Sequence, residues 1–400
     1  MAPEQAGPSR PRVLIVSASV GAGHSQAARA IADSLRTDIP QAPVEVVDVL
    51  AFAPWAFRAY YAGGYSLAVS KFPRVYGAGY WLNDRPQRAG RGPAEHFRLW
   101  HERQHLRRFA RYVSHCPPDL VVHTHFLAAP LLGRMRRLGQ LQVPQMVVVT
   151  DIRVHRFWYS EQVARWFVPA DESAETLRRW GIGPDRITVS GIPIHPKWTA
   201  PLHRERILAE WSLPADRPIV LLGGGVDFTC GPIVKTARRI VADCDDVFLA
   251  VLAGRNKKLL AQLSRLPEAG QRLVGISFTD RVQELVEVCS LMVTKAGGLS
   301  TAECLAKATP MVLLPPVPGQ EAGNAAHFAR QGAAVVARDA RDVADQVSRL
   351  LRDPDELDRM AENARRLYRP ATKTIAAAIR EAVGHEGTTI QQGCRGSGES

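Results

Sequence analysis

The segment Thr294–Glu303 (TKAGGLSTAE) carries the residue pattern with the clearest chemistry. A strand is expected to end where this segment begins, and Gly297 and Gly298 follow it. A helix is expected next, with Ser300 or Thr301 as its cap. Backbone N–H groups at such a helix start are exposed, and the helix dipole favours negative charge there. The segment therefore predicts a binding site for a diphosphate.

Glu303 admits two interpretations. On the first turn of the expected helix, its carboxylate is well placed to accept hydrogen bonds from the hydroxyl groups of a ribose. It also stands three residues after Ser300, which is the spacing of a capping-box glutamate that only closes the helix start. The residues alone leave both interpretations open.

A second polar cluster, formed by Gln320, Glu321 and Asn324, follows the proline-rich stretch Pro315–Gly319. Amide and carboxylate side chains together suit sugar hydroxyls, which both donate and accept hydrogen bonds. The cluster predicts contacts to a sugar, and a solvated turn is the alternative.

Two further glycine turns follow expected strands. Gly21–His24 places His24 at the carboxyl end of the first strand, where open α/β sheets bind ligands, although a lone histidine is more often structural. The complete dinucleotide fingerprint is absent because Gln26 stands where its third glycine would be, which argues against a nicotinamide enzyme. The glycines of Gly223–Gly225 either let backbone N–H groups approach a phosphate or form only a flexible turn.

The elements that must position these residues form two alternating α/β units. Strands are expected at Arg12–Ser19, Val44–Val49, Asp119–Thr124, Gln145–Thr150, Trp166–Val168, Ile219–Leu222, Val247–Leu252, Leu273–Gly275, Leu291–Thr294, Met311–Leu314 and Ala334–Val336. Ile187–Ser190 leads into Gly191–Ile194, where we expect the first domain to end. Helices are expected between them, the first at Gln26–Arg36. We place an N-terminal domain at 12–195 and a C-terminal domain at 196–384, and we expect 1–11 and 385–400 to be disordered.

The 400-residue chain has a formal net charge of +12, which implies acidic partners such as nucleic acid, an anionic membrane or phosphorylated substrates. Much of the excess lies in Ala51–Tyr112, which holds eleven Lys or Arg, three Asp or Glu and many aromatic residues. We expect this segment to dock on a membrane surface, and the alternative is that its aromatic residues pack inside the N-terminal domain.

Several classes of site and segment are not expected. The six cysteines form neither a C-x-x-C pair nor a spaced Cys/His set, so no zinc site and no disulfide framework is predicted. No apolar run reaches the roughly 18 residues that a membrane-spanning helix needs. The first twelve residues lack the apolar stretch of a signal peptide.

Taken together, several motifs resemble those of a known family. They are GAGH at Gly21–His24, the pattern of Thr150, Asp151, His155 and Trp158, the tripeptides Gly191–Pro193 and Gly254–Asn256, and KAGGLSTAE followed by PGQE and Asn324. On these motifs, from about Val13 to about Leu367, the chain resembles the monogalactosyldiacylglycerol synthase and processive diacylglycerol glucosyltransferase family. These enzymes are relatives of the peptidoglycan lipid N-acetylglucosaminyltransferase.

The resemblance implies the GT-B fold, an α/β architecture in which two Rossmann-like, doubly wound domains face a cleft and the C-terminal one binds the donor nucleotide. It implies that His24 and Asp151 are the catalytic candidates, as base or support of the base, and that Gly23, His155 and Trp158 bind the acceptor. The donor-binding residues that it implies are Gly223, Gly224, Arg255, Phe278, Lys295, Gly297, Gly298, Ser300, Glu303, Gly319, Gln320, Glu321 and Asn324.

For function, the resemblance implies an inverting glycosyltransferase that moves a hexose from a UDP-sugar to a hydroxyl group of a diacylglycerol-like lipid acceptor at a membrane surface. It implies no metal and no cofactor beyond the UDP-sugar as co-substrate. It also implies a cytoplasmic protein, peripherally bound to the anionic inner face of the cell membrane, with no nucleic-acid partner.

Two enzymatic alternatives stay open: a UDP-N-acetylglucosamine 2-epimerase-like enzyme, and a glycosyltransferase that acts on a polyprenyl or natural-product acceptor. A non-enzymatic module that binds nucleic acid or membrane, which the charge alone would permit, leaves the donor-like C-terminal half unexplained.

Overall fold

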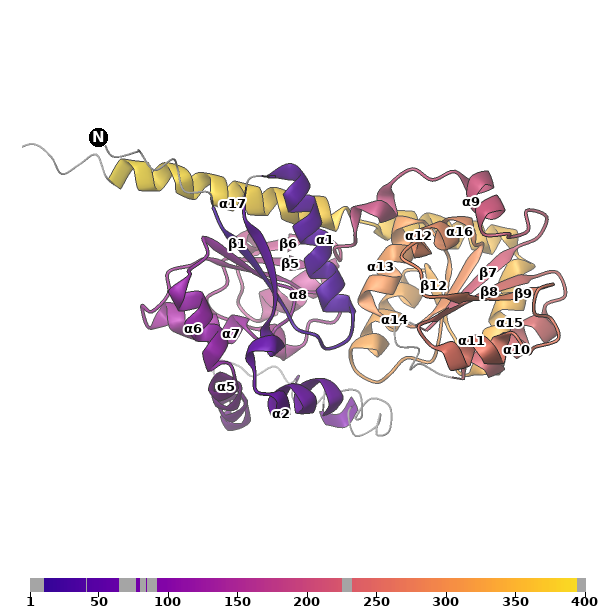
Figure 1. Cartoon of the computed structure of the whole chain (residues 1–400), viewed down its shortest axis with the longest axis horizontal. Helices are drawn as coiled ribbons and strands as arrows, with labels where there is room; N and C mark the ends of the chain where they lie inside the picture. Colours follow the sequence, from indigo (N-terminus) through magenta and orange to yellow (C-terminus); the bar gives the residue numbers. More distant parts are fainter. Residues whose placement is uncertain are drawn as a thin grey trace, which may run out of the picture.

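The computed structural model describes residues 11–40, 42–64, 77–79, 84, 92–224 and 232–393. In these ranges the chain forms two α/β domains side by side, each built on a six-stranded sheet (Figure 1). Neighbouring strands run parallel throughout both sheets. Two doubly wound parallel sheets confirm the predicted fold class.

The N-terminal sheet has the strand order β2-β1-β3-β4-β5-β6. Its strands are β1 (Val13–Ser17), β2 (Val44–Asp48), β3 (Leu120–His123), β4 (Gln145–Val148), β5 (Arg165–Val168) and β6 (Ile187–Val189). The helices of this part are α1 (Gly23–Asp38), α2 (Trp55–Arg58), α5 (Pro93–His105), α6 (Arg107–His115), α7 (Ala129–Arg137) and α8 (Asp171–Arg179), with short turns η1 (Val49–Phe52), η2 (Ala59–Gly63), η3 (Arg156–Trp158) and η4 (Pro184–Arg186).

The C-terminal sheet has the order β12-β11-β10-β7-β8-β9. Its strands are β7 (Ile219–Gly223), β8 (Phe248–Gly254), β9 (Leu273–Ser277), β10 (Leu291–Thr294), β11 (Met311–Leu313) and β12 (Ala334–Val336). The helices from the linker onward are η5 (Pro196–Thr199), α9 (Arg204–Glu210), α10 (Ile233–Asp243), α11 (Lys257–Leu263), α12 (Val282–Val288), α13 (Gly298–Ala306), α14 (Gln320–Arg330), α15 (Ala340–Leu351), α16 (Pro354–Leu367) and α17 (Ala371–Gly393).

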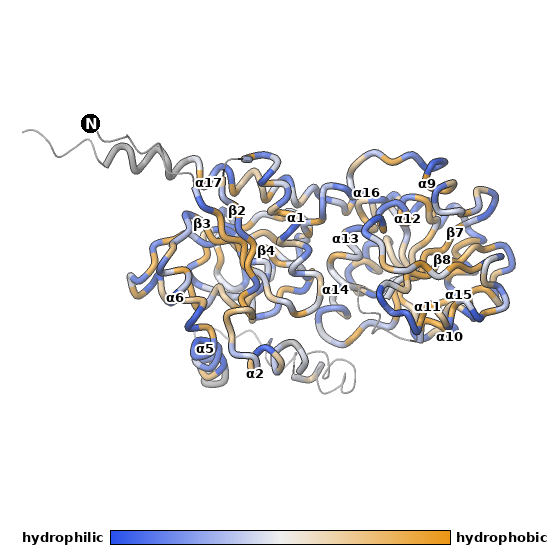
Figure 2. The backbone as a smooth tube through the Cα atoms, viewed as in Figure 1, coloured by the Kyte–Doolittle hydropathy of each residue, from blue (hydrophilic) through white to orange (hydrophobic). Residues whose placement is uncertain are grey.

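The strands lie where the apolar runs predicted them. β1 and β7 bury every residue, because helices cover both faces of a parallel sheet and leave no polar face to alternate with. Figure 2 shows this as hydrophobic strands at the centre of each domain and hydrophilic segments at the outside. Each of the eleven predicted strands is confirmed, and β6 (Ile187–Val189) is a strand that was not predicted from the sequence. The first helix begins at Gly23 rather than at Gln26, so His24 lies on its first turn and not in the loop before it.

The chain crosses between the domains twice, at two segments that touch. Gly191 has a φ of +85°, and a Cβ built on it would lie 3.1 Å from the Cβ of Arg369. The Thr372 hydroxyl donates to the carbonyl oxygen of Ile194 at 2.6 Å. Glycine at position 191 is therefore required both by its backbone conformation and by the close approach of the second crossover.

The second crossover returns the chain to the N-terminal domain, where α17 packs along α1 (Figure 1). The proposed domain boundary at 384 thus falls inside a helix whose apolar face belongs to the first domain. Residues 385–393, which we expected to be disordered, continue this helix, while 1–10 and 394–400 lie outside the described residues. In the described part of the chain, no helix has both the length and the apolar character to cross a bilayer.

Replacing Ile375 or Ile379 of α17 by alanine should destabilise the N-terminal domain, although both residues lie near the far end of the chain. Both side chains are completely buried against the first sheet and α1. An isoleucine-to-alanine change in a core costs about 2–5 kcal/mol. Urea unfolding measures the loss, with Lys373→Ala at an exposed position of the same helix as control. Equal midpoints for the isoleucine variants and the control would contradict this packing.

Candidate active site

The loops that leave the carboxyl ends of the two sheets meet between the domains. A Cβ built on Gly298, at the start of α13, would lie 2.0 Å from the carbonyl oxygen of Thr150, which follows β4. A Cβ built on Gly23 would lie 3.9 Å from Leu299. Only glycine at position 298 permits this approach of the two backbones. The meeting place lies at the edge where open α/β sheets bind ligands.

His24 is held by groups that follow two other strands of the first sheet. Its Nδ1 lies 2.9 Å from the carbonyl oxygen of Thr124 and 3.0 Å from the hydroxyl oxygen of Thr150. Because a carbonyl oxygen can only accept, Nδ1 carries the proton and Nε2 is left unprotonated. Burial lowers the pKa of His24 to about 4, against the opposing hydrogen bond to Thr124. The ring is therefore neutral at physiological pH.

The residues expected to bind the acceptor lie around His24 to different degrees. Gly23 precedes it on α1, and the ring of Trp158 lies 6.2 Å from it between centroids, with 3% of that side chain exposed. His155 is buried, and its Nδ1 accepts from the Phe157 N–H at 3.1 Å, which begins η3. Trp158 thus lies close to the His24 ring, and His155 caps the turn η3 that carries Trp158.

Asp151 follows β4 and faces the second domain. Burial raises its pKa to about 6; the charge of Glu321 adds to the rise, while the amide of Asn324 and the charge of Lys295 oppose it. The carboxylate is therefore ionised above about pH 6 but holds a proton more firmly than an ordinary aspartate. Such tuning suits a general base, whose pKa is best placed near the working pH.

Asn324 joins the two domains. It is completely buried on α14, and its Oδ1 accepts from the Ile152 N–H at 2.9 Å. Its Nδ2 donates to the carbonyl oxygen of Ala296 at 3.0 Å and lies 3.4 Å from Oδ1 of Asp151. With both amide hydrogens in use, Asn324 acts here as an interdomain tie, and its contact with a donor sugar stays a prediction.

The start of α13 differs from the expected cap. The helix begins at Gly298 with Gly297 as N-cap and without a side-chain cap, so the expectation of a Ser300 or Thr301 cap is wrong. The Thr301 hydroxyl instead points back and donates to the carbonyl oxygens of Gly297 and Gly298, at 3.0 Å each. Among the described residues, the N–H groups of 298–300 make no hydrogen bond. These donors are the ones that a diphosphate requires.

Glu303 is accordingly the sixth residue of α13 and lies on its second turn, not its first. A capping box needs the third position, so the structure excludes that interpretation. Burial raises the pKa of Glu303 to about 8, against the charge of Lys197. In the described part of the chain Glu303 makes no hydrogen bond, so its oxygens can accept from a ligand.

Lys295 and the first turn of α14 stand beside this helix start. Nζ of Lys295 lies 3.2 Å from Oε1 of Glu321. Gly319, the N-cap of α14, has a φ of +115°, a conformation that favours glycine, and Gln320 follows it. The structure thus brings the two sequence motifs KAGGLSTAE and PGQE together through an ion pair.

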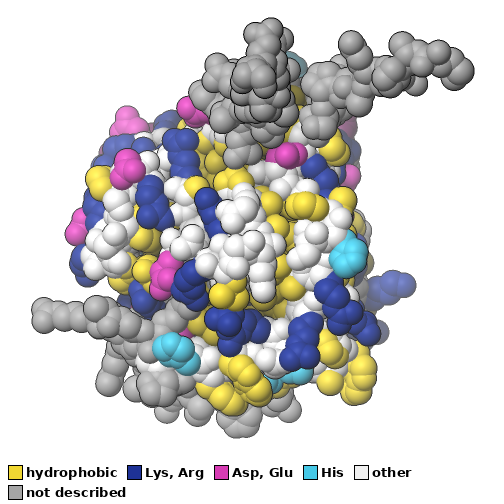
Figure 3. All heavy atoms as spheres, turned by 90° about the vertical axis from the view of Figure 1, so that its left-hand side faces the viewer, with side chains coloured by type: hydrophobic (Ala, Val, Ile, Leu, Met, Phe, Trp, Pro, Cys, Tyr) yellow, Lys and Arg dark blue, Asp and Glu magenta, His cyan; other side chains and the backbone are white. Residues whose placement is uncertain are grey.

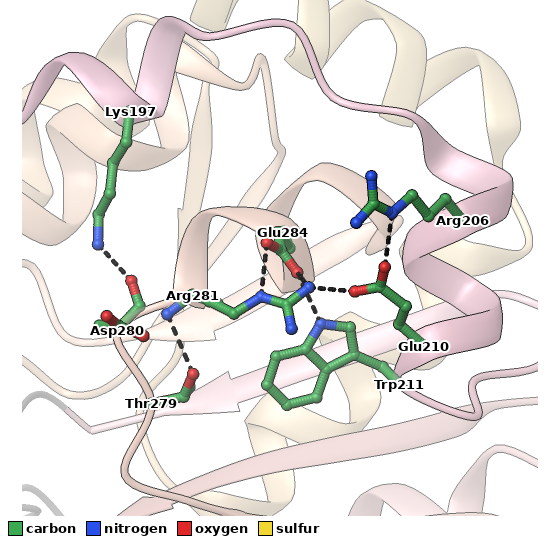
Figure 4. A network of polar contacts seen from close by, with 8 residues as sticks. All are labelled: Lys197, Arg206, Glu210, Trp211, Thr279, Asp280, Arg281 and Glu284. Atoms are coloured by element: carbon green, nitrogen blue, oxygen red, sulfur yellow. Dashed lines mark hydrogen bonds and ion pairs between the residues drawn. The ribbon is translucent and has the colours of Figure 1, made fainter.

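Arg255, which follows β8, and Phe278, which follows β9, form an exposed pair. The Arg255 guanidinium lies 4.3 Å above the Phe278 ring, which is 52% exposed. Figure 4 shows how the loop after Phe278 is braced: the Arg281 side chain is held by Glu284 and Glu210. In the same network, Trp211 donates to Glu284 at 2.9 Å, Thr279 accepts from the Arg281 N–H at 3.0 Å, and Lys197 donates to the carbonyl oxygen of Asp280.

The remaining glycine loop is only partly described. Gly223 ends β7, where a Cβ would lie 3.1 Å from the Leu252 side chain, and Gly224 follows it. Gly225 and residues 226–231 lie outside the described residues. A phosphate contact from Gly223 and Gly224 therefore stays a prediction.

Sequence reasoning missed the groups that set the state of His24. His125 is buried with its ring 4.7 Å from that of His24, in an edge-to-face arrangement. Thr124 accepts from His24 Nδ1 and donates its hydroxyl to the His24 carbonyl oxygen at 3.0 Å. The available signal was the polar run His123–His125 at the end of a strand, since such ends meet at one edge of a parallel sheet.

Comparisons with known proteins agree with this geometry. A family model described as monogalactosyldiacylglycerol (MGDG) synthase matches residues 24–194, and one described as glycosyltransferase family 28 C-terminal domain matches residues 220–381. The processive diacylglycerol β-glucosyltransferase of Bacillus subtilis is 31% identical over 263 residues, 66% of this chain and 68% of that protein. Its counterpart in Bacillus licheniformis is 29% identical with the same coverage.

Solved structures share the fold at low identity. The UDP complex of Staphylococcus aureus MnaA has a TM-score of 0.63 at 15% identity and covers 94% of this chain and 97% of its own. Acinetobacter baumannii MurG has a TM-score of 0.59 at 16% identity, with 93% and 100% covered. The fold is of the GT-B class, and the family models with the similar Bacillus sequences define a glycosyltransferase. Within that class, the chain belongs to the monogalactosyldiacylglycerol synthase and processive diacylglycerol glucosyltransferase family.

We expect His24 to stay neutral, with Nε2 as the unprotonated nitrogen, down to about pH 4. The Thr124 carbonyl oxygen fixes the tautomer, and burial opposes the charged ring. A ¹⁵N NMR titration of the imidazole nitrogens measures both properties, with His24→Gln to assign the signal. A midpoint near 6.5, or a proton on Nε2 at neutral pH, would contradict this description of the site.

Proposed function

We propose that the protein transfers a hexose from a UDP-sugar to the hydroxyl group of a diacylglycerol-like lipid, and that it needs no metal or other cofactor. The observation that carries the proposal is the meeting of two half-sites across the domain interface. The uncapped glycine start of α13 stands on one side, and Asp151 and His24 stand on the other. The names of the similar Bacillus enzymes supply the acceptor class and the transferred hexose.

In this reaction the acceptor oxygen forms a bond to the anomeric carbon, and the bond from that carbon to the diphosphate breaks. The electron pair leaves with UDP, and the N–H groups at the start of α13 stabilise the developing charge without having to reorganise. Attack from the opposite side inverts the configuration. The hydroxyl proton passes to a base on the N-terminal side.

The two pKa values distinguish the roles of the N-terminal residues. We assign the base to the Asp151 carboxylate, because its pKa of about 6 makes it the stronger proton acceptor of the two. His24, with a pKa of about 4, remains a neutral group whose free Nε2 accepts a hydrogen bond from the acceptor hydroxyl and orients it.

Several solved structures with this fold are UDP-N-acetylglucosamine 2-epimerases. Their identity of 16% or less makes the likeness one of fold, which both classes of enzyme share. The similar sequences that cover two thirds of the chain are glucosyltransferases. Sequence therefore favours transfer over epimerisation.

We propose that the protein associates peripherally with the anionic cytoplasmic face of the membrane through α2 and α5. Phe57 of α2 stacks on His105 of α5 at 4.6 Å, so the two helices lie together. Outward-facing aromatic side chains stand on this edge, with exposed fractions of 78% for Trp55, 71% for Tyr60 and 66% for Phe97. Aromatic rings of this kind settle at the headgroup level of a bilayer.

Basic residues surround the aromatic edge. Figure 3 shows Lys and Arg side chains gathered on the lower half of the N-terminal end of the molecule, above exposed hydrophobic side chains. The exposed arginines of α6, namely Arg107, Arg108 and Arg111, belong to this part of the chain. Residues 65–76, 80–83 and 85–91, a large part of the segment expected to dock, lie outside the described residues.

Glu303→Gln should weaken UDP binding and remove part of its pH dependence. Ribose hydroxyls donate to the carboxylate form, so affinity is expected to rise with pH toward the Glu303 pKa of about 8 and then to level. Loss of hydrogen bonds to a charged acceptor costs roughly 1.5–3 kcal/mol each. Calorimetry from pH 6 to 9 measures the UDP affinity of the wild type and of Glu303→Gln. Because UDP titrates in the same way in both experiments, its own titration cancels in the comparison. An unchanged affinity at pH 9 in a folded variant would remove Glu303 from the site.

Asp151→Asn should lower kcat by roughly 10²–10⁴ and abolish the fall in rate below about pH 6. The wild-type rate declines there because the base becomes protonated. His24→Ala should lower kcat less and should keep that acid limb. UDP affinity of both variants serves as the control for folding. An acid limb that persists in Asp151→Asn would transfer the role of base to another group.

Replacing Trp55 and Phe97 together by serine should weaken binding to vesicles, since burial of each large apolar side chain is worth about 1.5–3 kcal/mol. Flotation with vesicles that contain diacylglycerol measures the partition, and UDP affinity confirms that the donor site is intact. A partition equal to that of the wild type would place membrane contact elsewhere on the molecule.

A further inference from the structure

The C-terminal domain has a basic hollow that the proposed reaction does not use. It lies between α10 and α11, has a volume of about 520 Å³, and is lined by Lys235, Arg238 and Lys258 together with Asn256 and Gln262. We call it the basic hollow. Its apolar floor includes Ile233 and Leu259, two buried residues of the core beneath these helices.

The basic hollow lies on the opposite face of the sheet from α13 and α14, although Asn256 in its lining directly follows Arg255 of the expected donor site. α10 and α11 pack on the face of the sheet that carries Val220 and Leu249. α13 and α14 pack on the opposite face, against Leu221 and Ala250. A ligand in the hollow would therefore lie across the sheet from the start of α13.

The charges of the hollow are uncompensated within the described residues. Its described lining contains no Asp or Glu. By contrast, Arg239 on the same helix is paired with Asp243 at 2.8 Å. None of the ion pairs found in the described ranges includes Lys235, Arg238 or Lys258, and all three are exposed. Three cations that share a hollow without a counter-charge repel one another, which an anionic ligand relieves.

The position of the hollow indicates which anion it meets. In Figure 1, α10 and α11 lie along the lower side of the C-terminal domain, the side on which α2 and α5 lie in the N-terminal domain. The aromatic edge on α2 and α5 is the part that we propose to meet the bilayer. Amides and cations above an apolar floor suit a phosphate group that is attached to a glycerol backbone.

We propose that the basic hollow binds the phosphate headgroup of an anionic phospholipid and so forms a second membrane contact, on the donor-binding domain. This inference rests on the proposed membrane function. The aromatic edge anchors the N-terminal domain, and the hollow holds the C-terminal domain on the same bilayer. Both half-sites are then kept above the lipid surface from which the acceptor enters.

The test compares two triple variants of equal charge change. K235E/R238E/K258E alters the hollow, and R359E/R365E/R366E alters exposed arginines of α16, on the upper side of the same domain in Figure 1. Flotation with phosphatidylcholine vesicles that contain phosphatidylglycerol measures partition. Each basic residue near an anionic surface is worth about fivefold in binding, so the hollow variant should bind roughly a hundredfold more weakly. The α16 variant should change far less.

Folding and the proposed function are controlled separately. UDP affinity and the thermal midpoint should match the wild type in both variants, and K235Q/R238Q/K258Q replaces the glutamate variant if it unfolds. Equal partition of the hollow and α16 variants, with the wild type bound, would overturn the inference and leave the proposed membrane function standing. If the wild-type protein does not bind anionic vesicles, both the inference about the basic hollow and the proposed membrane function are overturned.

Discussion

Thr150 and Gly298 approach each other so closely that a Cβ on Gly298 would lie 2.0 Å from the Thr150 carbonyl oxygen. This contact sets the distance between the two sheets, because Thr150 lies two residues after the end of β4 and Gly298 begins α13. Asn324 fixes the direction of the approach by bonding to Ile152 on one side and to Ala296 on the other. Glycine at position 298 thus serves the interface, because any side chain there would push the two domains apart.

The close contact between the domains also explains the shifted pKa values of the site. Asp151, His24 and Glu303 all have their pKa values shifted first of all by burial, and in each case toward the neutral form. None of the ion pairs found among the described residues includes any of the three. Removal of water from groups on both sides of the domain interface thus leaves two carboxyl groups with raised pKa values and a neutral imidazole.

The strands and helices were predicted from the sequence more accurately than the residues at which the helices begin. Eleven of the twelve strands were predicted because buried parallel strands are continuous apolar runs. The short edge strand β6 was missed, and its residues are only partly buried. The start of α13 was misplaced because Gly297 is the N-cap where a hydroxyl side chain was expected. The helix α1 begins three residues before its predicted start, after Ala22 as N-cap. The role of Asn324, the packing of α17 and the part of His125 depend on contacts between distant segments, and no local pattern carries that information. The candidate residues were identified from the motifs that resemble those of the family. Only the structure shows which of these residues contact one another.

The motif Gly191–Pro193 has a structural role at the connection between the two domains. Gly191 lies where the chain first leaves the N-terminal domain, pressed against Arg369 where it returns, and Thr372 bonds the second crossover to the first. Any change in the angle between the domains must turn about these joined segments while the bonds of Asn324 break. Asp151 would then meet water, and its pKa would fall back toward that of an ordinary aspartate. The raised pKa of Asp151 therefore depends on the contact between the domains, because burial at that contact is its main cause.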